Sequence, residues 1–216
     1  MSDEFDDLDQ DAPGEILIDP GVDPGTDVAG ILLAEQVAGQ VESFLEALRA
    51  VAVARDAGRG ISLLLLEISQ VLLAGARLGA HRDFVPRGDF QPDVGPEADL
   101  DELRLALAGV LGDVDTYSFV FDPYAPEVVE GQLSDDLSSI ATDLENGLRH
   151  HRDGNVVEAL WWWQFSYVAS WGNLAGAALN ALLSIVTHDR LDVDLGVDVE
   201  QIEAAEAALD ADTDVS

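Results

Sequence analysis

A long uncharged segment near the C-terminus constrains the fold of this chain more than any other feature. No Asp, Glu, Lys or Arg occurs between Glu158 and Asp189, and all four tryptophans of the protein lie within residues 155–188. A helix that is apolar on every side is either buried inside a protein or embedded in a membrane. The segment therefore predicts the axis of a helical bundle or a transmembrane helix.

The polar content of this segment favours the bundle. A spanning helix needs about 20 apolar residues, and its flanks usually carry Lys or Arg, with aromatic side chains at both interfaces. Here no basic cluster flanks the segment, and the tryptophans crowd one end of it. We therefore expect a buried, Trp-rich central helix and no contact with a membrane. The polar side chains that interrupt the segment are Gln164, Ser166, Ser170, Asn173, Asn180 and Ser184.

A helical wheel divides the segment into two faces. Trp161, Trp163 and Trp171 share one broad face, which we expect to be core, and Gln164 beside them must find hydrogen bonds inside the protein. Trp162 lies opposite, among small residues that allow a neighbouring helix to approach closely. Because consecutive helical residues point about 100° apart, the tryptophans cannot form one stacking platform. We predict Trp162 to be an interaction residue that faces another helix or a partner subunit.

The charge of the chain is concentrated at its two ends. The 216 residues include 43 acids and 10 bases, all of them Arg, for a formal charge of −33. Residues 1–27 and 191–216 carry acids and no base, and we expect both to be acidic tails, the first one disordered. The bundle domain is predicted over residues 28–190. This charge argues against nucleic acid and anionic membranes as partners, since binding either one needs Lys or Arg.

Other features of the composition limit location and chemistry. The chain has no cysteine, which excludes disulfides and Cys-based zinc sites. Its first residues show neither a basic region nor an apolar stretch of the kind found in signal peptides. We therefore expect a cytoplasmic protein.

The hydrophobic pattern predicts an all-α, up-and-down bundle of about five main helices. Apolar spacing indicates helices over residues 27–56, 98–113 and 134–152, while residues 61–80 are apolar on nearly every side. Gly58 and Gly60 are expected to end the first helix. The Asp153-Gly154 turn should fold the fourth helix against the Trp-rich fifth as an antiparallel pair.

An aromatic segment separates the third and fourth predicted helices. Residues 115–127 contain four aromatic side chains, and Pro123 and Pro126 forbid a continuous helix. We predict a loop that its rings pin to the bundle, because a short β-like stretch here has no evident partner strand. The aromatic residues are Tyr117, Phe119, Phe121 and Tyr124.

A polar stripe on the helix of residues 61–80 is the best candidate for a ligand site. Glu67, Gln70 and Arg77 fall within about 80° of one another on a helical wheel, and His81 lies on the same stripe. Polar groups on so apolar a helix must be paired or hydrated. Either they bind a small polar or anionic ligand, with Arg77 as its charge partner, or Glu67 forms an internal salt bridge with an Arg of another helix.

Three residues outside the stripe complete the ligand hypothesis. Tyr124 lies in the aromatic segment, which could close over a pocket, and Arg149 and His150 lie at the end of the fourth helix. His150 also aligns with Asp136 and Asp143 at seven-residue steps. Such steps are about 10 Å apart, too far for side chains of one helix to share an ion. We predict no metal and no cofactor.

The function hypotheses follow from what the sequence lacks. It contains no Gly-rich phosphate loop, no nucleophile elbow and no Ser/His/Asp signature. We predict a non-enzymatic protein-interaction or scaffold domain, either a homodimer or bound to another protein. The alternative is a small-ligand- or metal-binding enzyme that uses the stripe of residues 67–81. A solvent-reachable cavity lined by the stripe together with His150 or Tyr124 would favour the alternative.

Three segments carry a resemblance to a known family. They are LLEISQVLLAGARLGAHRDFVP (residues 65–86), YSFVFDPYAPEVV (117–129) and EALWWWQFSYVASWGNLAGAALNAL (158–182). Together they resemble a bacterial domain-of-unknown-function family that is best represented in actinobacteria. The resemblance covers roughly residues 30–190. It implies an all-helical cytosolic domain and no activity, cofactor or site residue.

Overall fold

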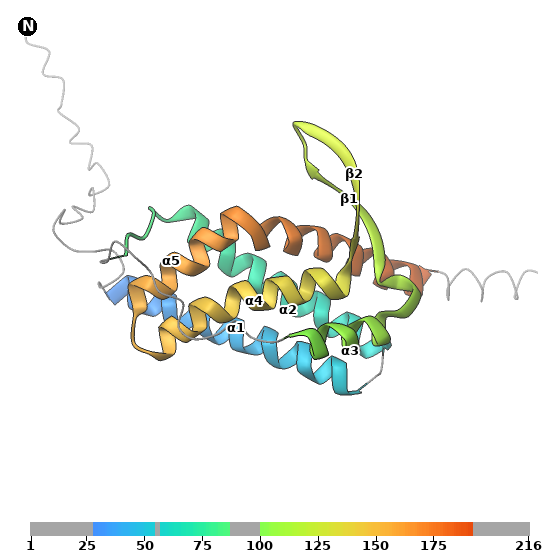
Figure 1. Cartoon of the computed structure of the whole chain (residues 1–216), viewed down its shortest axis with the longest axis horizontal. Coiled ribbons are helices and arrows are strands. Elements are labelled where there is room, and N and C mark those ends of the chain that lie inside the picture. Colours follow the sequence, from blue (N-terminus) through green and yellow to red (C-terminus); the bar gives the residue numbers. More distant parts are fainter. Residues whose placement is uncertain (1–27, 55–56, 87–99, 192–216) are drawn as a thin grey trace, which may run out of the picture.

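The computed structural model describes residues 28–54, 57–86 and 100–191, which are mostly helical (Figure 1). The C-terminal helix passes through a π-helical segment, η2 (Tyr167–Trp171), and continues to Leu191; we call residues 156–191 the long helix. Apart from Leu191, both predicted acidic tails lie outside the described residues. The five helices are α1 (Val28–Ala54), α2 (Ala57–Ala80), α3 (Asp101–Leu111), α4 (Leu133–Arg152) and α5 (Val156–Ser166).

The helices form a bundle in which α1 packs against each of the other four. Its buried side chains include Phe44 and Leu48, which are fully enclosed. Gly58 and Gly60 were expected to end the first helix. They do not, because both lie inside α2. A Cβ at residue 60 would crowd the Val51 side chain. Gly60 therefore permits close contact between α1 and α2.

The predicted antiparallel pair of the fourth and fifth helices is confirmed. The turn between α4 and α5 contains Gly154 in the left-handed region, with φ of 79°. The indole N–H of Trp163 donates to the carbonyl of Leu144 on α4 at 2.9 Å. Trp163 lies flat against α4 because residue 147 is Gly, where a Cβ would overlap the indole. The Trp163 ring of α5 thus fills the space that Gly147 leaves open on α4.

The long helix is not covered on all sides. Trp163 and Trp171 are buried, whereas Phe165 is 54% exposed and Val168 is 70% exposed. The expectation of a helix buried all round is therefore not confirmed. In the described part of the chain, α1 instead contacts each of the other four helices.

A β-hairpin replaces the loop that the sequence analysis predicted for residues 115–127. Strand β1 (Thr116–Asp122) pairs antiparallel with β2 (Ala125–Gln132), so the fold is not all-α. Each strand of a two-stranded sheet is an edge strand, where proline is tolerated, which explains Pro126 in β2. In the turn, the Asp122 carboxylate accepts a hydrogen bond from the Tyr124 N–H at 2.8 Å. We call residues 116–132 the arm.

The base of the arm is fixed to α4, and the remainder projects from the bundle (Figure 1). The Asp115 carboxylate accepts hydrogen bonds from the Ser134 N–H and hydroxyl, both at 2.8 Å, and so pairs one of the free backbone N–H groups at the N-terminus of α4. The Tyr117 hydroxyl donates to Asp136 at 2.6 Å. Beyond these contacts, every side chain from Val120 to Glu130 is exposed.

Two helices meet the length and composition requirements for crossing a membrane, Gly58–Ala80 and Val156–Leu191. Core helices of soluble proteins meet the same requirements. Both helices pack against α1 and against each other. In the most apolar window of each helix, 39% and 22% of the residues are buried within the described structure, so neither is enclosed in the way that a core helix usually is.

Candidate functional site

The polar stripe on α2 does not line a cavity in the described structure. Glu67 is half-buried, and Gln70, Arg77 and His81 are exposed. None of these four side chains lines any of the three cavities found in the described part of the chain. His81 instead stacks on the Phe84 ring, with centroids 5.9 Å apart. The stripe is therefore a solvated surface of α2.

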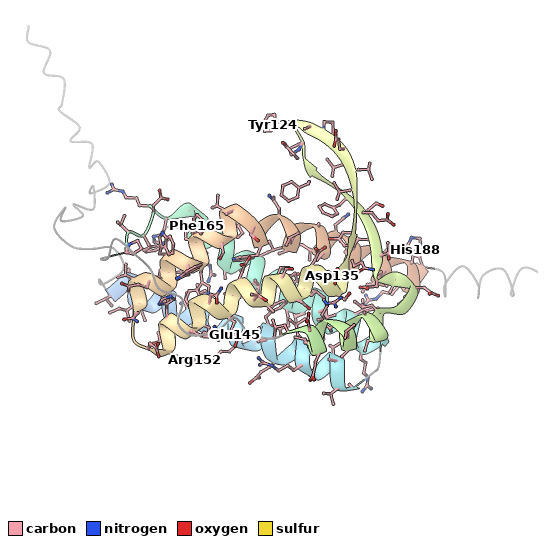
Figure 2. The ribbon with its side chains drawn as sticks, in the orientation of Figure 1. Tyr124, Asp135, Glu145, Arg152, Phe165 and His188 are labelled. Carbon is pink, nitrogen blue, oxygen red and sulfur yellow. The ribbon has the colours of Figure 1, made fainter. Side chains whose placement is uncertain are left out.

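Of the other predicted ligand residues, Tyr124 lies apart from Arg149 and His150, which are neighbours at the end of α4. Tyr124 sits at the tip of the arm and is 97% exposed, far in the view from the end of α4 marked by Arg152 (Figure 2). Arg149 lies 4.0 Å from the Glu145 carboxylate on its own helix. His150 is buried and stacks on the Trp162 indole, with centroids 6.1 Å apart. No common site brings these residues together with the stripe.

Trp162 faces α4. Besides stacking on His150, it makes an edge-on contact with Trp161, whose ring centroid is 5.1 Å away. Its indole Nε1 is buried and has no hydrogen-bond partner among the described residues. Of the two partners that the sequence analysis left open, the structure places another helix of the same chain beside Trp162.

The aligned residues Asp136, Asp143 and His150 each have a different partner. Asp136 accepts from the Tyr117 hydroxyl, and Asp143 accepts from the Ser170 hydroxyl at 2.8 Å. Ser170 belongs to the π-helical segment, so this bond joins α4 to the irregular turn of the long helix. Among the described residues, no group of three or more His, Cys, Asp or Glu is arranged to hold a metal ion.

Burial shifts the pKa values of Asp136 and Asp143. It raises the pKa of Asp143 above its ordinary value, and the hydrogen bond from Ser170 partly opposes the shift. Burial also raises the pKa of Asp136, against the lowering effect of the Tyr117 hydrogen bond. The pKa of Tyr117 is raised well above its ordinary range by burial and by Asp136. The two carboxylates are thus partly desolvated links between elements.

An apolar cavity opens on the exposed face of the long helix. It has a volume of about 260 Å³, and Phe165 and Val168 form its exposed wall. Gln164 closes its inner side and is fully engaged: its amide donates to the Leu78 carbonyl at 2.8 Å and accepts from the Phe84 N–H at 2.9 Å. The predicted internal bonding of Gln164 is confirmed. We call this cavity the socket; its lining is Asp83, Phe84, Trp161, Gln164, Phe165, Val168 and Ala169.

A second cavity of about 350 Å³ lies between the arm and the long helix. Phe119 and Phe121 of β1 form one wall, and the opposite wall includes Asn173 and Asn180. Tyr117, Phe119 and Phe121 are in successive ring contact along the strand, with centroids 5.3 and 6.5 Å apart. The arm thus stands over the same helix that carries the socket. We call the surface of the long helix from Phe165 to Asn180, which includes both cavities, the outer face.

Charges differ in sign between the arm and the rim of the socket. The arm carries Asp122 and Glu127, both exposed, and no base occurs in the sequence from Leu105 to Leu148. Arg82 is exposed just after α2, where the Gln164 amide donates to its carbonyl at 3.2 Å. Asp83, in the socket lining, lies next to Arg82 and offsets its positive charge.

The sequence analysis missed Phe165 and Val168 as surface residues. On the helical wheel Phe165 lies about 40° from Ala169, on the side expected to receive a neighbouring helix, whereas Val168 lies about 20° from Trp161, at the edge of the face expected to be core. The apolar pattern shows which side chains are apolar, but not which of them another helix of the described chain covers.

Comparison with known proteins identifies relatives without an assigned activity. A family model described as "Domain of unknown function (DUF5063)" matches residues 32–188. The chain is similar to the crystal structure of protein BF1032 from Bacteroides fragilis, with a TM-score of 0.54 and 17% sequence identity over 74% of this chain and 94% of that one. At this identity the likeness shows the fold alone. Comparison with curated proteins gives no match.

Proposed function

The chain belongs to the family described as domain of unknown function DUF5063, and we propose that it is a soluble, non-enzymatic protein-interaction or scaffold domain. Its docking surface is the outer face of the long helix together with the arm. A partner on this surface would complete the burial of the Trp-rich helix. We also propose that the domain binds neither nucleic acid nor membranes, because the chain has a charge of −33.

One observation carries this proposal: among the described residues, seven exposed large apolar side chains lie on the arm or the outer face, next to two cavities. Tyr124 is 97% exposed, Val128 is 75% exposed and Val168 is 70% exposed. Single exposed apolar residues are common on proteins, but a group of them beside cavities is typical of an interaction site. An arm that leaves a bundle with its edges unpaired is also a ready template for another chain.

The alternative, a ligand- or metal-binding enzyme that uses the stripe on α2, has less support. Its residues Gln70, Arg77 and His81 are exposed side chains on a convex helix surface. Small-molecule sites are usually concave and bury most of the ligand. Native mass spectrometry would favour the alternative if the purified protein retained a small molecule.

Site-specific photo-cross-linking in cells tests the docking surface. A photoreactive amino acid at Val168 should yield protein adducts, while the same residue at Val53, which is 82% exposed on α1, should not. Both positions are exposed valines on helices, so the comparison is matched. Equal adduct yields at the two positions, or none at Val168, would reject the outer face as a docking surface.

A further inference from the structure

The arm and the socket have the properties of two halves of one contact. Tyr124 lies at the tip of the arm, and its side chain is almost fully exposed. The socket is an apolar hollow of about 260 Å³ with aromatic walls. Pockets for cofactors and drug-sized ligands span about 300–1,000 Å³. The socket is smaller than this and suits a single inserted side chain.

One pair of opposite charges fits the same pairing. The arm presents Asp122 and Glu127 beside Tyr124, and Arg82 is exposed at the rim of the socket, next to Asp83 of its lining. Two copies of a chain with a charge of −33 repel each other over most of their surfaces. They can approach where acidic and basic groups meet, or where charge is absent. The long helix between Glu158 and Asp189 supplies the uncharged surface.

The arrangement along the long helix allows both contacts to form at once. The socket is lined by helix residues 161–169, and residues 119–121 of β1 stand over residues 172–180 of the same helix. A two-fold axis between these stretches would make the long helices of two copies antiparallel. Each arm would then face the socket of the other copy. An isologous contact of this kind closes on itself and stops at a dimer.

We propose that the domain forms a two-fold symmetric homodimer in which Tyr124 of each copy inserts into the socket of the other. Asp122 and Glu127 face Arg82 across the contact. Aromatic anchors in apolar pockets commonly dominate binding energy, with charged pairs at the rim that set orientation and association rate. The inference rests on the proposed function, since it names the occupant of the docking surface.

The first test compares association constants of the full-length protein by sedimentation equilibrium. The unaltered chain should be a dimer, and Tyr124→Ser and Val168→Ser should each raise its dissociation constant by about tenfold or more. Both side chains are exposed in the single chain, so neither change should unfold it. Val53→Ser is the matched control and should leave the constant unchanged. A monomeric unaltered chain would overturn the inference.

Charge exchange tests the orientation of the contact. Arg82→Glu and Asp122→Arg should each weaken self-association. In an equimolar mixture of these two variants, the mixed dimer has one native and one charge-exchanged rim contact, so it should associate more tightly than either variant alone. Arg49→Glu, at an exposed position on α1, is the control and should change neither value. Failure of the mixture to exceed both single variants would reject the assigned pairing.

The absence of cysteine permits a direct test of proximity. A mixture of Tyr124→Cys and Val168→Cys chains should form a disulfide-linked dimer under mild oxidation, and Tyr124→Cys mixed with Val53→Cys should not. A double Tyr124→Cys, Val168→Cys chain that yields only an internal disulfide would show that the arm folds onto its own socket. That result, or a monomer, rejects the second copy as occupant. The cross-linking comparison of Val168 with Val53 would still decide the proposed docking surface.

Discussion

The two faces of the long helix are both uncharged and carry large apolar side chains, but their surroundings differ. The inner face carries Trp163 and Trp171, both buried, and the outer face carries Phe165 and Val168, both exposed. Both faces are free of charged residues. What distinguishes them is the surface opposite: the inner face meets glycines and hydrogen-bond acceptors on α2 and α4.

The contacts of the inner face explain this difference. Gly147 leaves room for the Trp163 indole, and Gly75 leaves room for the rings of Tyr167 and Trp171. The Trp171 Nε1 also donates to the Ser166 hydroxyl at 3.1 Å, whereas the Trp162 Nε1 is buried without a partner among the described residues. Apolar character alone therefore does not decide which face of a helix becomes core. Complementary space and paired polar atoms decide it.

The largest expected effect comes from removing an aromatic side chain on each face. Trp163→Ala should reduce the free energy of unfolding by about 3–5 kcal/mol, because it leaves a cavity between α4 and α5. Phe165→Ala, two residues away and half-exposed, should cost less than about 1 kcal/mol. Urea denaturation of both variants at low protein concentration measures the difference. Equal losses would show that the faces are not distinct.

A smaller loss is expected when a methyl group is added on the inner face. Gly147→Ala should destabilise the fold by about 1–3 kcal/mol, because its Cβ overlaps the Trp163 indole. Gly39→Ala, on α1 with open space around it, should be neutral or stabilise the helix by up to about 1 kcal/mol. Thermal unfolding of the two variants should move in opposite directions. A stable Gly147→Ala protein would contradict the close contact of α4 with α5.

Polar pairing gives the third comparison. Gln164→Leu keeps much of the side-chain volume but leaves the buried Phe84 N–H and the end of α2 without partners. We expect a loss of about 1–3 kcal/mol in denaturant unfolding. Asn173→Leu on the outer face, where the side chain is exposed, should change stability by no more than about 0.5 kcal/mol. A neutral Gln164→Leu would show that these hydrogen bonds are dispensable.

The smallest effect is a change in the pH dependence of stability. The pKa of Asp143 is raised in the folded protein, so its favourable contribution is present at low pH and is lost as pH rises through the folded pKa. Asp143→Asn should remove this loss, so its stability relative to the unaltered chain should improve as pH rises from acid toward neutrality. Ser170→Ala should raise the pKa further and extend the loss to higher pH. Parallel pH profiles for all three proteins would contradict the link.

Much of the helical framework is predictable because its signals are local. The apolar spacing of α4, the Asp153-Gly154 turn and the Trp-rich start of α5 together specify the antiparallel pair. The internal bonding of Gln164 follows from a polar side chain on an apolar face. These features depend on residues that are near one another in the sequence.

The arm and the candidate site depend on contacts that the sequence does not display. The alternation of Tyr117, Phe119 and Phe121 is a strand signal, but its partner β2 contains Pro126, Glu127 and Gly131 and has weak strand propensity. The charges of the polar stripe were visible, but whether they line a cavity depends on the elements around α2. Likewise, the exposure of Phe165 depends on the absence of a covering helix in the described chain.

The central claim is that the inner face of the long helix holds the fold together and the outer face binds a second copy. The most direct measurement is the subunit number of the full-length protein by native mass spectrometry, alongside Val168→Ser and Val53→Ser. The account predicts a dimer for the unaltered chain and for Val53→Ser, and mainly monomer for Val168→Ser, with all three proteins folded. A monomer in all three, or a dimer that Val168→Ser does not weaken, would contradict it.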